Sequence, residues 1–132
     1  MASELRVNTL KDASGNNSIA TSVVFAGTAK AWINPAANYG SIQASYNISS
    51  LDDDGTGDYG LHFTNNMGNA TYCVTFGIDD DGSASVVIGQ DTTNGTMATG
   101  NFDFEAYYLN SSNNRTNYDY ANHYMVITGD LA

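Results

Sequence analysis

The chain contains few cationic residues and few charges of any kind. Lys and Arg account for 4 of the 132 residues and charged residues for 14%, yet the formal net charge is −10. A nucleic-acid-binding surface needs clustered cations, because these displace the counterions that surround the phosphates. Four cations spread along the sequence cannot form such a cluster, so we expect no nucleic-acid partner.

Cysteine and long apolar runs are also scarce. The single cysteine, Cys73, cannot form an intramolecular disulfide, and no CxxC or Cys/His metal-ligand spacing occurs. No run of eighteen apolar residues is present, so the sequence predicts no membrane insertion. The opening residues show no basic region followed by an apolar one, as a Sec signal would. We therefore expect a protein that is made and kept soluble in a cytoplasm.

In place of charge the chain carries Asn, Ser, Thr, Gly and Tyr, which favour strands and turns over helices. Apolar and polar residues alternate along most of the chain, as in half-buried antiparallel strands, and no stretch has a helical period. The predicted strands cover residues 19–25, 29–35, 40–49, 58–64, 70–78, 84–90, 101–109 and 123–130. This pattern predicts an all-β fold: an antiparallel β-sandwich or jelly-roll-like domain of about eight strands, over residues 19–132.

Two similar loops predict how the central strands pair. LDDDGTGD (residues 51–58) and IDDDGSAS (residues 78–85) each contain Asp-Gly between alternating segments, which is a strong hairpin signal. We therefore predict a meander. In the register that keeps inward residues inward, Tyr59 pairs with Phe76, Leu61 with Val74 and Phe63 with Tyr72.

Residues 1–18 differ from the rest of the chain. Leu5, Val7 and Leu10 are their only large apolar residues, which is too few to join a sandwich core. We predict an N-terminal arm or collar that docks on a neighbouring copy or on another protein.

Several motifs indicate a family. They are SELRVNTLKDASGNNSIATS (residues 3–22), GTAKAWIN (27–34), SYNISSLDDDGTGDYGLHFTNNM (45–67) and NATYCVTF (69–76). Together they resemble the KAWxN, SxN(V/I)SS, GTGxY and NYxV pattern of bacteriophage tail-fibre or baseplate-fibre structural proteins of the marine and cyanophage type. The chain departs from that pattern in its loops, with NPAANYG after KAW and Gly68 where members often carry Pro.

The resemblance implies a virion structural protein, assembled in the host cytoplasm and located in the tail. It implies a homotrimer, contacts with other tail or baseplate proteins, and a contribution to assembly and host attachment. It brings no catalytic residues, so we expect no enzymatic activity.

Acidic residues in the first DDDG loop are candidate metal ligands. Asp52, Asp54 and Asp58 supply the carboxylate oxygens that Ca²⁺ prefers, as do Asp53 and the acids of the second loop. The spacing lacks the alternating acids, central Gly and distal Glu of an EF-hand. Asp and Gly are also the residues that hairpin turns use. We favour plain turns, and expect neither metal nor cofactor.

Three other side chains have chemistry worth testing. In the predicted register His62 lies opposite Cys73, where the pair could ligate a soft metal, but we favour a face that is solvated or packs on a partner. A catalytic Cys–His dyad lacks an orienting third group. Trp32 lies on the face opposite Ala31 and Ile33, and could stack on a sugar, anchor a subunit or pack in the core.

The stretch from Glu105 to Tyr124 combines tyrosines, asparagines and one arginine. Rigid aromatic rings beside amides are typical of adaptable recognition surfaces, which commonly lie on loops. Its alternatives are a polar loop without a ligand and a subunit interface. The predicted receptor-binding residues, toward a partner such as a host surface glycan, are Tyr107, Asn113, Arg115, Tyr118 and Tyr120.

Two other functions remain open from the sequence. One is a monomeric, lectin-like carbohydrate-binding module with a Ca²⁺-bearing loop, and the other is a capsid decoration protein. A glycan-hydrolysing enzyme would need two carboxylates at a fixed separation in a cleft, and the sequence offers no such pair.

Overall fold

A computed structural model describes residues 3–36, 39–78, 86–92, 95, 97–120 and 123–132. These residues form an all-β, antiparallel, sandwich-like domain, as the sequence predicts, with eleven strands instead of eight and one short helix. The elements are β1 (Thr9–Lys11), β2 (Ser18–Ala20), α1 (Thr21–Gly27), β3 (Ala29–Pro35), β4 (Ile42–Tyr46), β5 (Ile48–Gly55), β6 (Asp58–Phe63), β7 (Cys73–Ile78), β8 (Val86–Gln90), β9 (Asn101–Leu109), β10 (Arg115–Asn117) and β11 (His123–Thr128). The second DDDG loop lies outside the described residues.

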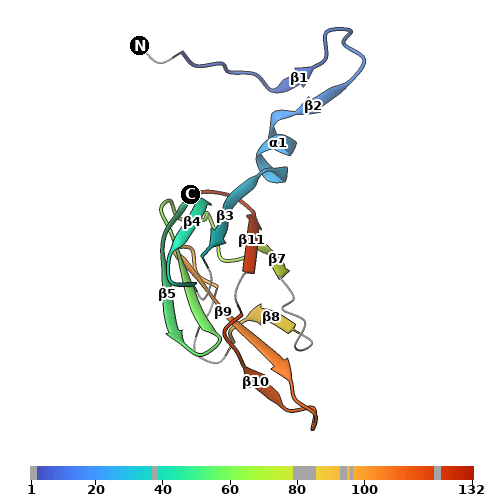
Figure 1. The fold of residues 1–132 in the computed structure, drawn as a ribbon. Coiled ribbons are helices and arrows are strands. Elements are labelled where there is room, and N and C mark those ends of the chain that lie inside the picture. Colours follow the sequence, from blue (N-terminus) through green and yellow to red (C-terminus); the bar gives the residue numbers. More distant parts are fainter. Residues whose placement is uncertain (1–2, 37–38, 79–85, 93–94, 96, 121–122) are drawn as a thin grey trace.

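Two larger sheets make up the sandwich (Figure 1). The four-stranded sheet has the order β4-β3-β11-β7. In the five-stranded sheet, β5 pairs with β6 and β6 pairs with β9. Glu105 of β9 faces Asp58 of β6 and Gly89 of β8, so β6 and β8 flank opposite edges of β9. β10 pairs with the last three residues of β9, on the same edge as β6 but beyond the end of β6.

The core between the sheets is rich in aromatic rings. Tyr39 stacks on Tyr59 with ring centroids 4.0 Å apart, and Phe104 stacks on Tyr59 at 5.4 Å. Burial raises the pKa of both tyrosine hydroxyls well above the ordinary value. The buried apolar residues are Ala31, Ile33, Tyr39, Ile48, Tyr59, Leu61, Phe63, Met67, Tyr72, Phe102, Phe104, Ala106, Tyr120, Met125 and Ile127.

The single strand predicted over residues 40–49 is wrong, because the chain changes sheets at Asn47. β4 ends at Tyr46 and β5 begins at Ile48, in different sheets. Asn47 has φ of 58°, a conformation that Asn adopts more readily than most residues. Its side chain accepts from the Asn65 N–H at 2.7 Å and donates to the Asn65 carbonyl at 3.0 Å. Tyr46 and Ile48, which one continuous strand would place on the same face, are consequently 52% exposed and buried, respectively.

The predicted pairing of β6 with β7 is also wrong. β7 pairs with β11 in the opposite sheet, so His62 and Cys73 are not cross-strand neighbours. Phe63 and Tyr72 still meet, but across the core, with ring centroids 5.6 Å apart. Alternation therefore predicts which face of each strand is buried and leaves the partner strand undetermined.

Residues 3–28 form a projecting segment outside the two sheets. β1 and β2 pair as a hairpin, and α1 replaces most of the strand predicted over residues 19–25. No residue of this segment is buried. Strand formation depends on packing against neighbouring strands, and the residues of α1 have none, which explains why they are helical. Figure 1 shows the hairpin extending away from the sandwich. Lys30 joins its base to β3, because its ammonium donates to the Phe25 carbonyl and to Thr28 Oγ1.

A buried histidine makes the core sensitive to pH. His123 is fully buried beside Tyr39 and Tyr120, and neither ring nitrogen has a hydrogen-bond partner among the described residues. Burial lowers the pKa of His123 from 6.5 to about 4. The unfolded chain therefore takes up this proton first as the pH falls below 6.5, and the folded state loses stability until about pH 4.

We expect His123→Phe to remove this pH dependence. The free energy of unfolding of the wild type, minus that of the variant, should fall by about 3 kcal/mol between pH 7 and pH 4. Denaturant titrations at intermediate pH values measure this difference, and the subtraction cancels the shared titration of the carboxylates. Parallel curves for the two proteins would show that His123 titrates normally in the folded state.

Candidate functional site

The predicted recognition stretch folds into the β9–β10 hairpin, at the end of the molecule opposite the projecting segment (Figure 1). Asn110 builds its turn, since its side-chain oxygen accepts from the backbone N–H groups of Ser112 and Asn114, both at 3.0 Å. Asn113 occupies the left-handed region, with φ of 59°, and is exposed at the tip. Some of the asparagines that suggested recognition therefore shape the turn.

One face of the hairpin carries an aromatic and ionic cluster. The guanidinium of Arg115 lies over the ring of Tyr107, 4.4 Å from its centroid. Arg115 also forms an ion pair with Glu105, whose side chain is only 9% exposed. The hydrogen bond to Glu105 raises the pKa of Arg115 above its ordinary value. A buried carboxylate thus fixes the only cation of this hairpin against an aromatic ring.

The other predicted tyrosines lie on a different side of the hairpin. Tyr118 is 41% exposed and makes edge-to-face contacts with Tyr108 and Tyr120, with centroids 5.8 and 4.7 Å apart. Tyr120 is 1% exposed and belongs to the core, so it is not available to a ligand. The structure therefore exposes Asn113, Arg115 and Tyr118 on this hairpin, leaves Tyr107 half-buried beneath Arg115, and withdraws Tyr120 into the core.

The tip of the β5–β6 hairpin anchors this region to the sandwich. Gly57 accepts from the Ala106 N–H at 2.8 Å, and its own N–H donates to Asp119 Oδ1 at 2.6 Å. The same carboxylate oxygen accepts from the Tyr59 hydroxyl at 2.9 Å. Ala106 in turn accepts from the Tyr118 N–H at 3.1 Å. Tyr118 is therefore held in place by its own N–H, which donates to Ala106, and by the neighbouring Asp119, which accepts from Gly57 and Tyr59.

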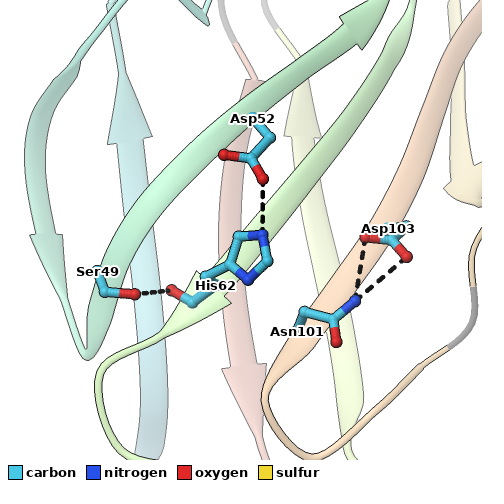
Figure 2. A network of polar contacts seen from close by, with 5 residues as sticks. All are labelled: Ser49, Asp52, His62, Asn101 and Asp103. Carbon is cyan, nitrogen blue, oxygen red and sulfur yellow. Dashed lines mark hydrogen bonds and ion pairs between the residues drawn. The ribbon is translucent and has the colours of Figure 1, made fainter.

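The candidate metal ligands do not converge. Asp52 contacts His62 Nε2 at 2.7 Å on the outer face of the five-stranded sheet, as Figure 2 shows. Burial and neighbouring acids raise the pKa of Asp58. The DDD residues Asp52–Asp54 lie within β5, and the turn itself is at Thr56 and Gly57. Among the described residues no three His, Cys, Asp or Glu side chains are arranged to hold a metal ion.

The remaining candidates are exposed on the opposite sheet. Trp32, for which the sequence left three roles open, is 38% exposed on the outer face of β3, so it does not fill the core. Cys73 is exposed at the start of β7, where it faces Thr128 of β11. It has no imidazole beside it in that register, so the predicted His–Cys pair is absent from these strands.

Sequence reasoning missed the residues that hold the hairpin in place. Glu105 and Asp119 looked like ordinary surface acids, yet each one binds a specific partner. Glu105 takes a polar position in the alternation of β9, so no pattern in the sequence indicated that it would be buried. Gly57 belongs to a GTG turn motif, in which two glycines predicted a turn but not its partner.

Comparisons with protein-family models, curated proteins and solved structures find no match to this chain. In the part of the chain that the structure describes, no helix is long and apolar enough to cross a membrane.

Gly57→Ala tests the anchor of the hairpin. Gly57 has φ of +67°, and a methyl group there would lie 2.7 Å from the Tyr118 nitrogen and closer still to the Ala106 oxygen. We expect a loss of at least about 2 kcal/mol in the free energy of unfolding, measured by denaturant titration.

Gly89→Ala is the matched control, because a methyl group on β8 meets no atom within 4 Å. We expect it to change stability by no more than about 0.5 kcal/mol. Equal stabilities of the two variants would contradict the close packing described at Gly57.

Proposed function

We propose that this chain is a structural subunit of a phage tail fibre or baseplate fibre, which contributes to assembly and to host-cell attachment. The family resemblance over residues 3–76 motivates the proposal. The observation that carries it is the projecting segment, whose apolar side chains have no place in the chain's own core.

The exposure of that segment calls for a partner. Leu5 is 80% exposed, Phe25 69% and Val23 56%, and Leu10 and Ile19 lie side by side on the hairpin with more than 40% of each exposed. Apolar side chains grouped in this way are typical of protein–protein interfaces. A subunit that functions only inside an assembly accounts for such a segment, whereas a monomeric lectin-like module does not.

The arrangement of the two ends supports a role in a fibre. The projecting segment and the β9–β10 hairpin lie at opposite ends of the molecule (Figure 1). One end can therefore serve assembly while the other stays accessible to a host surface.

The chemistry of the hairpin fits attachment by short-range contacts. A chain of net charge −10 gains nothing from long-range attraction to an anionic cell envelope. Stacking on Tyr107 and Tyr118 and hydrogen bonds to Arg115 or Asn113 act at contact distance. Many copies on one virion would multiply weak individual contacts.

We expect the purified chain to be a homotrimer. Light scattering behind size-exclusion chromatography should give three times the mass of one chain, because the family resemblance implies a trimer and a closed ring gives every projecting segment an equivalent partner. A Leu10→Ser/Ile19→Ser variant should shift toward monomer without losing its β-sheet circular dichroism. A stable monomer of the wild type at high concentration would favour the lectin-like alternative.

We expect the hairpin tyrosines to support adsorption to host cells. Phage carrying Tyr107→Ser/Tyr118→Ser should adsorb more slowly, whereas Tyr107→Phe/Tyr118→Phe keeps the rings and should adsorb nearly as well as the wild type. Circular dichroism and oligomeric state should be unchanged in both variants. Normal adsorption of the serine variant would assign attachment to another protein, and loss of the oligomer would assign the tyrosines to a subunit interface.

A further inference from the structure

The strands of the two sheets differ sharply in their content of acidic residues. β3, β4, β7 and β11 contain no Asp or Glu, whereas β5, β6 and β9 contain six of them. The acidic outer face includes Asp52 and Asp103, which are drawn in Figure 2. A second acidic chain would be repelled by one sheet and not by the other.

The acid-free sheet carries exposed apolar side chains that are in register. Trp32 of β3 faces Tyr46 of β4 on one side and Val126 of β11 on the other, and Tyr124 lies two residues along from Val126. Their exposed fractions are 38%, 52%, 43% and 40% in that order. We call Trp32, Tyr46, Tyr124 and Val126 the neutral face. Trp and Tyr are the residues that most often dominate the binding energy of protein interfaces.

The projecting segment matches this face in charge and in polarity. Residues 3–28 contain two acids and two bases and are neutral, so the rest of the chain carries the whole net charge of −10. The segment also holds exposed apolar residues, such as Leu10, Ile19 and Phe25. It can therefore approach the neutral face of another copy without electrostatic repulsion and bury apolar area on arrival.

In this conformation the projecting segment does not cover the neutral face of its own chain. The segment extends away from its own sandwich (Figure 1), and both surfaces remain exposed. Near its base, Phe25, Lys30, Asp130 and Leu131 line an open groove of about 540 Å³. Lys30 alternates with Trp32 along β3, so this groove continues the neutral face toward the segment.

We propose that the neutral face is the docking surface for the projecting segment of a second copy of this chain. The contact joins two different surfaces, so it forms a closed ring if the rotation between neighbouring copies completes a circle, and an open filament if it does not. The inference rests on the proposed function and names the surface through which assembly occurs. A sugar ligand is less well matched, because the four strands offer no carboxylate to bind hydroxyl groups beside the rings.

The single tryptophan allows a direct test in the unlabelled full-length chain. Acrylamide quenching of Trp32 is measured across a concentration series, with light scattering on the same samples. We expect quenching to fall several-fold and the emission to shift to the blue as the oligomer forms. Leu10→Ser/Ile19→Ser should keep Trp32 accessible at every concentration, with unchanged circular dichroism.

The single cysteine identifies what covers the face. Cys73 lies on β7 beside the neutral face and can carry a benzophenone, and mixing ¹⁵N-labelled with unlabelled chains reveals crosslinks between copies. We expect crosslinks from Cys73 to residues 5–25 of another copy. The matched control, Cys73→Ser/Ser50→Cys, places the probe on the acidic sheet, where Ser50 is exposed, and should give none to that segment.

The outcomes separate the two proposals. An oligomer in which Trp32 stays fully accessible, or in which Cys73 crosslinks only to the sandwich of another copy, would overturn the docking surface and leave the assembly role standing. A monomer at all concentrations would overturn both. Protection of Trp32 by added saccharide in a monomeric sample would overturn the docking surface and assign this face to a glycan.

Discussion

The stacking of aromatic rings between the two sheets is the interaction on which the rest of the structure depends. Tyr59 lies at its centre, stacked on Tyr39 and Phe104, with its hydroxyl bonded to Asp119. This hydrogen bond connects the core to Asp119, which lies between β10 and β11. The buried His123 packs against the ring of Tyr59, so the group that makes stability depend on pH lies in the same aromatic cluster.

Charge is distributed so that the two outer faces have different roles. One sheet carries acids, which keep copies of the chain apart, and the other is free of acids and presents Trp32 and Tyr46. A molecule of this kind is expected to associate through the surfaces that carry no acids, because contacts between acidic surfaces bring like charges together. Under the proposed function, the neutral projecting segment serves assembly and the hairpin at the opposite end serves recognition.

The sequence predicted the fold class and the inward faces of most strands, because the alternation in segments such as β6 and β9 reports burial directly. It predicted the β5–β6 hairpin from the first DDDG loop but not the partner of β7, since Tyr59, Leu61 and Phe63 point inward in either pairing. The change of sheet at Asn47 depends on one residue in the left-handed region, which alternation does not reveal. For the site, the hairpin was found from its composition, but the burial of Tyr120 and the anchoring contacts of Glu105 and Asp119 are long-range and have no local signal.

We propose that this chain is a subunit whose projecting segment is completed by another copy. Hydrogen–deuterium exchange of the β1 and β2 amides, compared at low and high protein concentration, tests this proposal. If the segment docks on another copy, these amides become protected only at concentrations where the oligomer forms, while those of β6 are protected throughout. Fast exchange of the β1 and β2 amides in the fully assembled protein would contradict it.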